Sequence, residues 1–413
     1  MPEPSARLRC VVVGASLAGV RAAEAIRRAG FDGRLTLIGA ETVFPPVDRP
    51  PLSKQVLLGA WEPARAALRV AVDLDAELLL GRSAASLALA DRQVVLDDGQ
   101  AVAFDGLLVA TGSVVRRLPE LESGQSRVHY LRTVDDCLAL RDRLREAKTI
   151  VIVGAGLIGL EVAAAARTLG VSVDVVDVLP APMERVAGPT VGHLIRRLHE
   201  SHGVRFHLGT SLVAVDAAGA TLGDGSVLPA DIILVAAGAR PATDWLAGTG
   251  LDIRDGIACD EFGRVLGAES VYADSVYAES VYAAGDVAAT RNLLYGRPLR
   301  VEHWTNAAAQ AEVAGMNLGR QLLGSRQAQP HQAIPYYWTD QYDWKLQMVG
   351  LVGPDVAAES DADGRRRAFR YSASGVLTGV LCVNWPSRLR LAKQELTQSL
   401  HAQRDRRAEA VSA

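Results

Sequence analysis

The chain has 413 residues, of which 49% are hydrophobic and 22% are charged, and its formal net charge is −3. This length is too great for one compact core, so two or three domains are expected, and the composition is ordinary for a soluble globular protein. The small net charge gives no support for binding to nucleic acid or to an anionic membrane surface.

The N-terminal stretch and the cysteines bear on the compartment. The first nine residues hold no apolar segment of signal-peptide length, and no apolar run reaches the ~20 residues that span a bilayer. The four cysteines lie far apart, which argues against a local redox disulfide, a zinc site or an iron–sulfur cluster held by clustered thiolates. We therefore expect a cytoplasmic protein without a metal site.

The first predicted elements form a βαβ unit. Residues 10–13 are a β-branched run typical of a buried parallel strand, residues 20–30 favour a helix, and residues 34–38 favour the next strand. The turn at residues 14–19 resembles the G-x-G-x-x-G pattern, with Ser16 in place of the middle glycine. Such a turn lets a pyrophosphate approach the helix N-terminus, and an acid such as Glu41 accepts a ribose hydroxyl.

A second βαβ unit begins 140 residues after the first and matches the pattern in full. Residues 149–153 and 171–177 favour strands, and Gly154, Gly156 and Gly159 occupy the three glycine positions. One glycine turn can be purely structural, but two copies in the same context predict two dinucleotide sites.

The acid that ends the second unit bears on the choice of nucleotide. Asp177 stands at the end of the strand, and the next arginine is Arg185. A carboxylate in this position binds the 2′-hydroxyl of the adenosine ribose and repels a 2′-phosphate. The second site is therefore predicted to take NADH rather than NADPH.

Two further strands carry the same small-residue ending. Residues 104–112 form an apolar run that ends at Thr111 and Gly112, and residues 231–241 repeat the pattern around Gly238. We interpret each as the strand by which the chain returns to its own nucleotide fold. The alternative is an ordinary turn from a strand into a loop, without a role in nucleotide binding.

Several motifs together resemble one family across about residues 8 to 395. They are residues 49–54 (RPPLSK), the two glycine turns, residues 110–112 (ATG), 131–133 (LRT), 284–286 (AGD), 302–304 (EHW) and 336–342 (YYWTDQY). With them the chain resembles the FAD-dependent, NADH-using ferredoxin reductases of oxygenase systems, the family of putidaredoxin reductase and rhodocoxin reductase. Disulfide reductases share the two-nucleotide plan but carry an early cysteine pair, which this chain lacks.

The resemblance implies an α/β fold with two Rossmann-like dinucleotide-binding domains and a C-terminal α/β domain. The FAD domain is expected to be discontinuous, at residues 1–115 and 245–328, with the NADH domain inserted at residues 116–244. Residues 329–413 are expected to form the C-terminal domain.

The resemblance also assigns residues to FAD. They are Gly14, Ser16, Leu17, Ala18, Gly19, Glu41, Arg49, Lys54, Ala84, Thr111, Gly112, Arg132, Asp286, Glu302 and Trp304. Lys54 is expected beside the flavin N5 edge, where its charge stabilises reduced flavin, and a solvated loop lysine is the alternative. Asp286 is expected to bind the ribityl chain. Trp304 is expected by the pyrimidine end, and a core aromatic is the alternative.

A second set is assigned to NADH: Gly154, Gly156, Gly159, Glu161, Asp177 and Gly238. Glu161 is expected against the nicotinamide ribose, and a glutamate that complements the helix dipole is the alternative. Lys54 and Glu161 are the two candidate catalytic residues.

The resemblance implies that NADH gives a hydride to FAD, a step in which positioning and electrostatics replace a side-chain acid or base. Electrons are then expected to pass singly to a [2Fe-2S] ferredoxin, since the chain has no cluster of its own. That ferredoxin would supply a haem-thiolate monooxygenase or a Rieske-type dioxygenase.

The C-terminal segment suggests where an acidic ferredoxin docks. Residues 361–413 hold ten Lys or Arg and five Asp or Glu, an excess of five positive charges. Arg291, Arg297, Arg300 and Lys345 are candidates to join them. We predict a basic docking face, and a solvated basic face without a partner is the alternative.

Other functions use the same plan. Monodehydroascorbate reductases and apoptosis-inducing-factor-like NADH oxidoreductases are sister enzymes, and a nucleotide-sensing protein without turnover is a different class. Flavin colour that bleaches with NADH separates the enzymes from the sensor.

A repeat precedes the AGD motif. The string SVYA begins at residues 270, 275 and 280, and the last copy leads to Asp286. In the family that the chain resembles, the same segment has room for one copy, so the two further copies add ten residues. Ten is an even number, so the insertion preserves which strand face each side chain takes. We predict that Ser280–Ala283 forms the strand before Asp286 and that the first two copies bulge from it.

Overall fold

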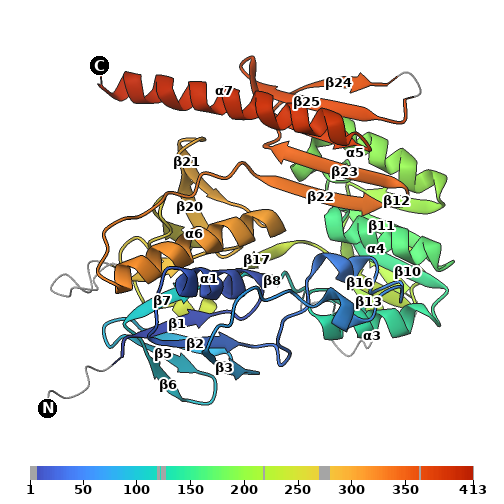
Figure 1. Ribbon diagram of the computed structural model, residues 1–413. Helices are drawn as coiled ribbons and strands as arrows, with labels where there is room; N and C mark the ends of the chain where they lie inside the picture. The colour runs from blue at the N-terminus through green and yellow to red at the C-terminus, as the bar shows by residue number, and fades with distance from the viewer. Residues whose placement is uncertain are drawn as a thin grey trace, which may run out of the picture.

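The computed structural model describes residues 7–118, 121, 127–216, 219–268, 280–361 and 364–412, the last five of these by their backbone alone. Three five-stranded sheets organise the chain, and smaller sheets connect them. Figure 1 shows the first sheet with α1 and α6 at the lower left, the second at the right, and the third above them with α7. Within the described part of the chain, no helix is both long enough and apolar enough to cross a membrane.

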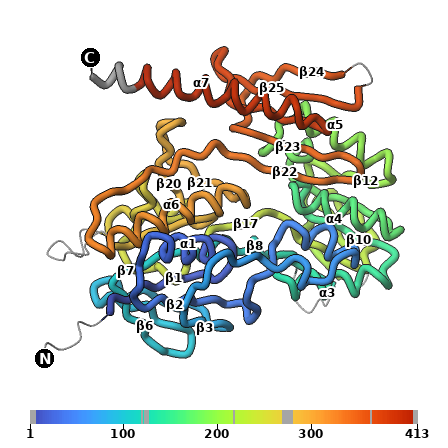
Figure 2. Tube along the Cα trace, in the orientation of Figure 1, coloured from blue at the N-terminus to red at the C-terminus, as the bar shows by residue number. Residues whose placement is uncertain are grey.

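The first sheet is parallel and has the order β19-β7-β1-β2-β3. Its strands are β1 (Arg9–Val13), β2 (Arg34–Gly39), β3 (Ala76–Leu80), β7 (Gly106–Val109) and β19 (Val281–Ala283). Helices α1 (Leu17–Arg28) and α6 (Trp304–Leu322) cover one face. The two helices cross so closely that a Cβ at Gly315 would overlap the backbone of Ala22. One nucleotide fold is thus built from two segments that lie far apart in the sequence, as the colours in Figure 2 show.

Smaller elements surround this sheet. They are the 3-10 turns η1 (Pro50–Ser53) and η2 (Pro63–Ala66), the sheet of β4 (Ala84–Ala88), β5 (Gln93–Leu96) and β6 (Ala101–Ala103), and the sheet of β18 (Ile257–Cys259), β20 (Ala288–Asn292) and β21 (Arg297–Arg300).

The second sheet is also parallel and has the order β12-β11-β10-β16-β9. Its strands are β9 (Val128–His129), β10 (Thr149–Val153), β11 (Ser172–Asp177), β12 (Val204–Leu208) and β16 (Ile232–Val235), with helices α3 (Val134–Leu144), α4 (Leu157–Thr168) and α5 (Glu184–Ser201). A meander of β13 (Leu212–Asp216), β14 (Gly219–Leu222) and β15 (Val227–Leu228) follows β12. The pair β8 (Ser113–Val115) and β17 (Ala239–Pro241) joins the entry and exit of this part, and η3 (Asp244–Leu246) comes after it.

The third sheet is antiparallel and has the order β22-β23-β26-β25-β24. Its strands are β22 (Tyr336–Gln341), β23 (Trp344–Gly350), β24 (Asp355–Ser360), β25 (Arg367–Ala373) and β26 (Val376–Val383). Helix α7 (Pro386–Ser412) packs on it through Leu389, Ala392, Leu396 and Leu400. These sheets confirm the α/β fold class expected from the sequence.

One hydrophobic cluster ties the three parts together. It joins Leu52 of η1, the strands of the second sheet and side chains of the third sheet such as Phe369 and Leu381. Buried apolar surface contributes about 25 cal/mol per Å², so such a shared core resists separation of the parts. The functional site described below lies where they meet.

The last copy of the SVYA repeat is the predicted strand. β19 pairs in parallel with β7, with Val281 opposite Leu107 and Tyr282 opposite Leu108, and Tyr282 is fully buried. The prediction for Ser280–Ala283 is therefore confirmed. The first two copies lie outside the described residues, and their predicted bulge stays a prediction.

Candidate functional site

The first glycine turn leaves no room for larger residues at its ends. Gly14 has a φ of +113°, and a Cβ there would overlap the carbonyl oxygen of Ala110. A Cβ at Gly19 would overlap the carbonyl oxygen of Gly14. Ser16 is the N-cap of α1 in an extended conformation, and its side chain makes no capping hydrogen bond. The N-terminal N–H groups of α1 are thus available to an anion.

The second turn repeats this geometry. Gly154 has a φ of +111°, and a Cβ there would overlap the carbonyl oxygen of Ala236. Gly156, the N-cap of α4, has open space around it: no described atom lies within 4 Å of the place a Cβ would take. Gly238 also has no described atom within 4 Å of the place a Cβ would take. The second turn therefore leaves space beside its backbone in which a pyrophosphate can bind.

The two acids at the strand ends have different partners. Glu41 accepts a hydrogen bond from Arg49 Nη2 at 2.9 Å. Asp177 accepts from the backbone N–H of Ala155, within the second glycine turn, at 2.6 Å, and from that of Leu179 at 2.8 Å. Both carboxylates stand where a ribose hydroxyl is expected in this fold.

Many of the predicted residues converge on a cavity of about 270 Å³ between the three parts. Those that line it are Ser16, Leu17, Ala18, Arg49, Lys54, Thr111, Gly112, Arg132, Glu161, Asp286, Glu302 and Trp304. Gly14 and Gly19 flank the lining residues of the first turn, and Glu41 contacts Arg49. The residues Gly154, Gly156, Gly159, Asp177 and Gly238 lie in the second nucleotide fold and do not line the cavity. Ala84 is placed in the side sheet, opposite Leu96, and does not line it either.

A buried ion pair lies in this cavity. Lys54 Nζ donates to Glu161 Oε1 at 2.8 Å, and their side chains are 13% and 6% exposed. Ser53 Oγ donates to Glu161 Oε2, and Thr339 Oγ1 donates to Glu161 Oε1 at 2.7 Å. A buried carboxylate needs such partners, because an unpaired charge is costly to bury. Glu161 therefore contacts both the FAD fold and the C-terminal sheet. A glutamate that only complemented the helix dipole would not need these partners.

A second charged group lies at the end of β19. Asp286 Oδ2 accepts from Ser113 Oγ at 3.0 Å and from Arg132 Nη2 at 3.3 Å. Arg49 Nη1 contacts the backbone oxygen of Arg132 at 3.4 Å, and burial together with the nearby Arg132 guanidinium lowers the pKa of Arg49 to about 10. Two cations and a carboxylate thus face the same space.

The aromatic wall of the cavity is fixed by a carboxylate. Trp304 Nε1 donates to Asp48 Oδ1 at 2.6 Å, and burial raises the pKa of Asp48 above its usual range. Trp338 meets Trp304 edge to face, with ring centroids 6.3 Å apart. Trp304 is therefore a wall of the cavity and not only a core residue.

Sequence reasoning missed several side chains of this site. They are Asp48, Ser53, Ser113, His303, Tyr337, Trp338 and Thr339. Five of them lie within the motifs that carried the resemblance, and Asp48 and Ser113 lie directly next to them. The alternation of buried residues along β22 marks Tyr337 and Thr339 as facing inward.

The cavity fits the groups that the sequence implies. Arg132 Nε and His303 Nδ1 are buried polar atoms without a hydrogen-bond partner among the described residues, and both side chains line it. Burial lowers the pKa of His303 to about 4, so the ring is neutral at pH 7. The uncovered glycine turns supply N–H groups for two pyrophosphates. The residues present therefore fit FAD in the first fold and NADH in the second. Among the described residues, no group of three or more His, Cys, Asp and Glu could hold a metal ion.

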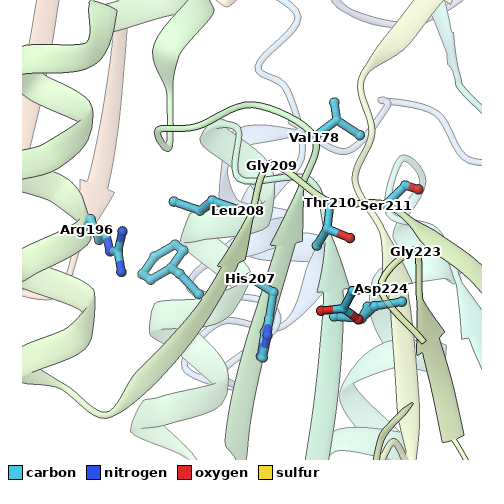
Figure 3. A pocket seen from close by; sticks show the side chains of 11 residues that line it. Val178, Arg196, His207, Leu208, Gly209, Thr210, Ser211, Gly223 and Asp224 are labelled. Carbon is cyan, nitrogen blue, oxygen red and sulfur yellow. The ribbon is translucent and has the colours of Figure 1, made fainter. Parts of the chain in front are cut away.

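A separate hollow of about 800 Å³ lies at the edge strand β12 (Figure 3). It is lined by Val178, Arg196, Phe206, His207, Leu208, Gly209, Thr210, Ser211, Leu222, Gly223 and Asp224. No predicted site residue lines it, so the smaller cavity is the candidate site.

Two family models match the chain. Pyridine nucleotide-disulphide oxidoreductase matches residues 8–311, and Reductase C-terminal matches residues 336–412. The chain is 36% identical over 387 residues to the anthranilate 1,2-dioxygenase system ferredoxin–NAD(+) reductase component of Burkholderia cepacia, with 91% of this chain and 90% of the relative covered. It is 32% identical over 407 residues to putidaredoxin reductase CamA of Pseudomonas putida, with 94% and 92% covered.

Solved structures agree. The crystal structure of the covalent putidaredoxin reductase–putidaredoxin complex matches with a TM-score of 0.86 and 30% sequence identity, covering 96% of this chain and 94% of that one. The ferredoxin reductase for the CYP199A2 system from Rhodopseudomonas palustris matches with a TM-score of 0.82 and 32% identity, covering 91% of each chain. The resemblance stated from the motifs is confirmed, and with it FAD and NAD(H) as cofactors. The chain belongs to the pyridine nucleotide-disulphide oxidoreductase family, in the branch of NAD-dependent ferredoxin reductases.

Proposed function

We propose that this enzyme takes a hydride from NADH onto FAD and passes single electrons to a [2Fe-2S] ferredoxin that supplies an oxygenase, either a haem-thiolate monooxygenase or a Rieske-type dioxygenase. The observation that carries the proposal is the single cavity in which the FAD fold, the NADH fold and the C-terminal sheet meet around Lys54 and Glu161. The relatives named as reductase components of dioxygenase systems support the choice of partner.

The residues of the chain supply binding, orientation and charge. FAD, when bound, accepts two electrons as a hydride and releases them one at a time. Ser16, Leu17 and Ala18 offer the N-terminus of α1 to its pyrophosphate, and Asp286 offers an acceptor to its ribityl hydroxyls. Lys54 holds a positive charge within the cavity, where charge that develops on reduction is stabilised more strongly than in water.

The second fold holds the donor. Gly154, Gly156 and Gly159 leave space for the NADH pyrophosphate, and Asp177 offers its carboxylate to the adenosine ribose. Glu161, on the helix that follows this turn, pairs with Lys54 and lines the cavity. The aromatic side chains Trp304 and Trp338 form part of the wall of the same cavity.

We also propose the division into residues 1–115 and 245–328 for FAD, 116–244 for NADH and 329–413 for the C-terminal domain. The joining of β19 to the sheet of β1, and the pairing of β8 with β17, support it. A cytoplasmic location is part of the proposal, supported by four cysteines that are all buried as free thiols. Cell fractionation would test it.

The docking surface is proposed on α7 and the β20–β21 hairpin. Exposed basic side chains there are Arg291, Arg297, Arg390, Lys393, Arg406 and Arg407, and Arg365 and Arg366 on the β24–β25 loop are exposed as well. Arg407 Nη1 reaches the backbone oxygen of Tyr295, so the end of α7 lies against the hairpin. Arg370 and Arg388 pair with Glu359 and Glu395 and contribute less free charge than the sequence count implied.

Salt tests this surface. Surface charge pairs are screened over about 8–10 Å at physiological ionic strength, so raising the salt from 50 to 300 mM should slow ferredoxin reduction at least about fivefold. NADH-driven reduction of ferricyanide, a small acceptor, should change little. Arg297→Glu should weaken ferredoxin reduction, and Arg143→Glu, at an exposed position on α3, serves as the matched control. An equal salt response with both acceptors would refute the docking surface.

The experiment that tests the function is an anaerobic titration of the purified, FAD-loaded protein with NADH. NADH should bleach the flavin, and a [2Fe-2S] ferredoxin from a panel should then recover the colour. Monodehydroascorbate as the better acceptor would favour the sister enzyme, and a protein that binds NADH without flavin turnover would favour a sensor.

A further inference from the structure

A chain of buried hydrogen bonds ends on the Glu161 carboxylate. It begins outside the cavity, at His199 on α5, and runs through the inward face of β22. His199, Thr339 and Gln341 are all fully buried. Neither the binding of the two nucleotides nor the docking of a partner accounts for it.

Each link of this chain has a definite direction. His199 Nε2 and Gln341 Oε1 lie 2.9 Å apart, and since an amide oxygen only accepts, the ring N–H donates. Tyr342 lies on the other side of the ring, with its hydroxyl 3.3 Å from His199 Nδ1. Gln341 Nε2 donates to Thr339 Oγ1 at 3.3 Å.

This direction decides what Thr339 does. Its oxygen already accepts from Gln341, so its hydroxyl hydrogen is left for Glu161 Oε1, 2.7 Å away. Ser53 Oγ donates to the other carboxylate oxygen. The Ser53 and Thr339 hydroxyls therefore both donate to Glu161, which is the pattern that an ionised carboxylate requires.

We propose that Thr339 and Ser53 are positioning residues for the Lys54–Glu161 pair, and that the C-terminal sheet, through Thr339 and Gln341, sets the charge balance of the cavity. The inference rests on the proposed function, in which Lys54 lies at the flavin. It assigns to the T-D-Q-Y stretch of β22 a role in tuning the redox centre beyond its role in packing.

The physical reason is the distribution of charge on Glu161. A hydroxyl donor disperses the negative charge of a buried carboxylate, because hydrogen bonds to charged groups are strong in a water-poor site. Without the Thr339 hydroxyl, the positive end of its O–H dipole no longer offsets the charge of the ionised Glu161 carboxylate. The electrostatic potential in the cavity becomes more negative, so reduction of the flavin, which adds negative charge, becomes less favourable.

The test is the midpoint potential of the bound flavin, measured by dye equilibration on the FAD-loaded enzyme. Thr339→Val keeps the side-chain shape and removes the hydroxyl. It should lower the equilibrium constant for flavin reduction about tenfold, which is about 30 mV for a two-electron couple. Thr339→Ser restores the donor and should restore the wild-type potential. The KM for NADH should stay within about twofold while kcat falls, because the changed interaction lies with the redox centre and not with the nucleotide-binding turn.

Thr378→Val is the matched control. Thr378, on β26 of the same sheet, has a buried hydroxyl without a hydrogen-bond partner among the described residues. Its removal should leave the potential unchanged. Thermal unfolding of each variant separates a loss of packing from a change in charge.

Two outcomes would overturn the inference: Thr339→Val with the wild-type potential, or Thr378→Val with the same shift as Thr339→Val. If Thr339→Val does not retain FAD, Thr339→Ala decides in its place, with the same expected direction. Failure of the proposed function appears elsewhere, in a wild-type protein that NADH does not bleach or that reduces no ferredoxin. Failure of this inference appears only when the flavin potentials of the variants are compared with each other and with the wild type.

Discussion

The two nucleotide folds of this chain share a turn but differ in what covers it. Gly14 and Gly154 have φ values of +113° and +111°, and each lies against the carbonyl of a neighbouring strand. At the middle position, Ser16 lines the cavity between the three parts, while Gly156 has open space around it in the described structure. The first turn therefore borders the cavity shared by the three parts, and the glycines of the second turn do not.

The largest effect should come from the geometry that the two turns share. Gly14→Ala forces a side chain into the Ala110 carbonyl at a φ that favours glycine, which should destabilise the protein by about 3 kcal/mol or more and abolish FAD retention. Gly156→Ala has space and an extended backbone, with a φ of −82°, and should fold and bind FAD normally. Flavin content and thermal unfolding measure both. Equal losses in the two variants would break the comparison.

Each fold also borders a buried neutral histidine. Burial lowers the pKa of His331, which contacts Asn306 of α6, and of His199 on α5 to about 4, against about 6.5 when unfolded. Unfolding therefore takes up protons below pH 6.5, so stability should fall with pH from 6.5 toward 4.

Each histidine should cost about 2 kcal/mol between pH 6.5 and 5. His331→Gln should flatten this dependence of the urea midpoint. A wild-type midpoint that does not change from pH 7 to pH 5 would contradict the assignment.

The smallest effects concern the middle position of the turn. Gly156→Ser places a side chain where the NADH pyrophosphate approaches and should raise the KM for NADH about tenfold, or ~1.4 kcal/mol. The reverse change, Ser16→Gly, should alter FAD affinity less than about twofold, since the FAD site has many other contacts. Steady-state kinetics and flavin titration of the apoprotein measure the pair. A larger effect in the FAD fold than in the NADH fold would contradict the idea that the other contacts of the FAD site compensate for the missing glycine.

The local part of this architecture could be predicted from the sequence. The β-branched runs, both glycine turns and the strand before Asp286 follow from periodicity and turn chemistry, which act over a few residues. The meeting of Glu161 with Ser53 and Thr339 could not, because the partners are 108 and 178 positions away and are joined only by the packing of three parts. The hydrogen bond from Trp304 to Asp48 spans 256 positions and has the same cause.

The basic C-terminal segment shows the limit of counting charges. The count over residues 361–413 excluded Glu359, which lies just before it on β24. In the folded chain Glu359 pairs with Arg388, whose side chain is only 11% exposed. A charge count over a sequence window cannot include partners that the fold supplies from outside the window.

The central claim is that one cavity couples a two-electron donor to a one-electron acceptor. The direct test is the stoichiometry of anaerobic electron transfer from NADH through the FAD-loaded protein to a [2Fe-2S] ferredoxin. Two ferredoxins reduced for each NADH oxidised, with bleaching of the flavin when ferredoxin is absent, is the predicted result. NADH oxidation that leaves every ferredoxin of the panel oxidised would contradict it.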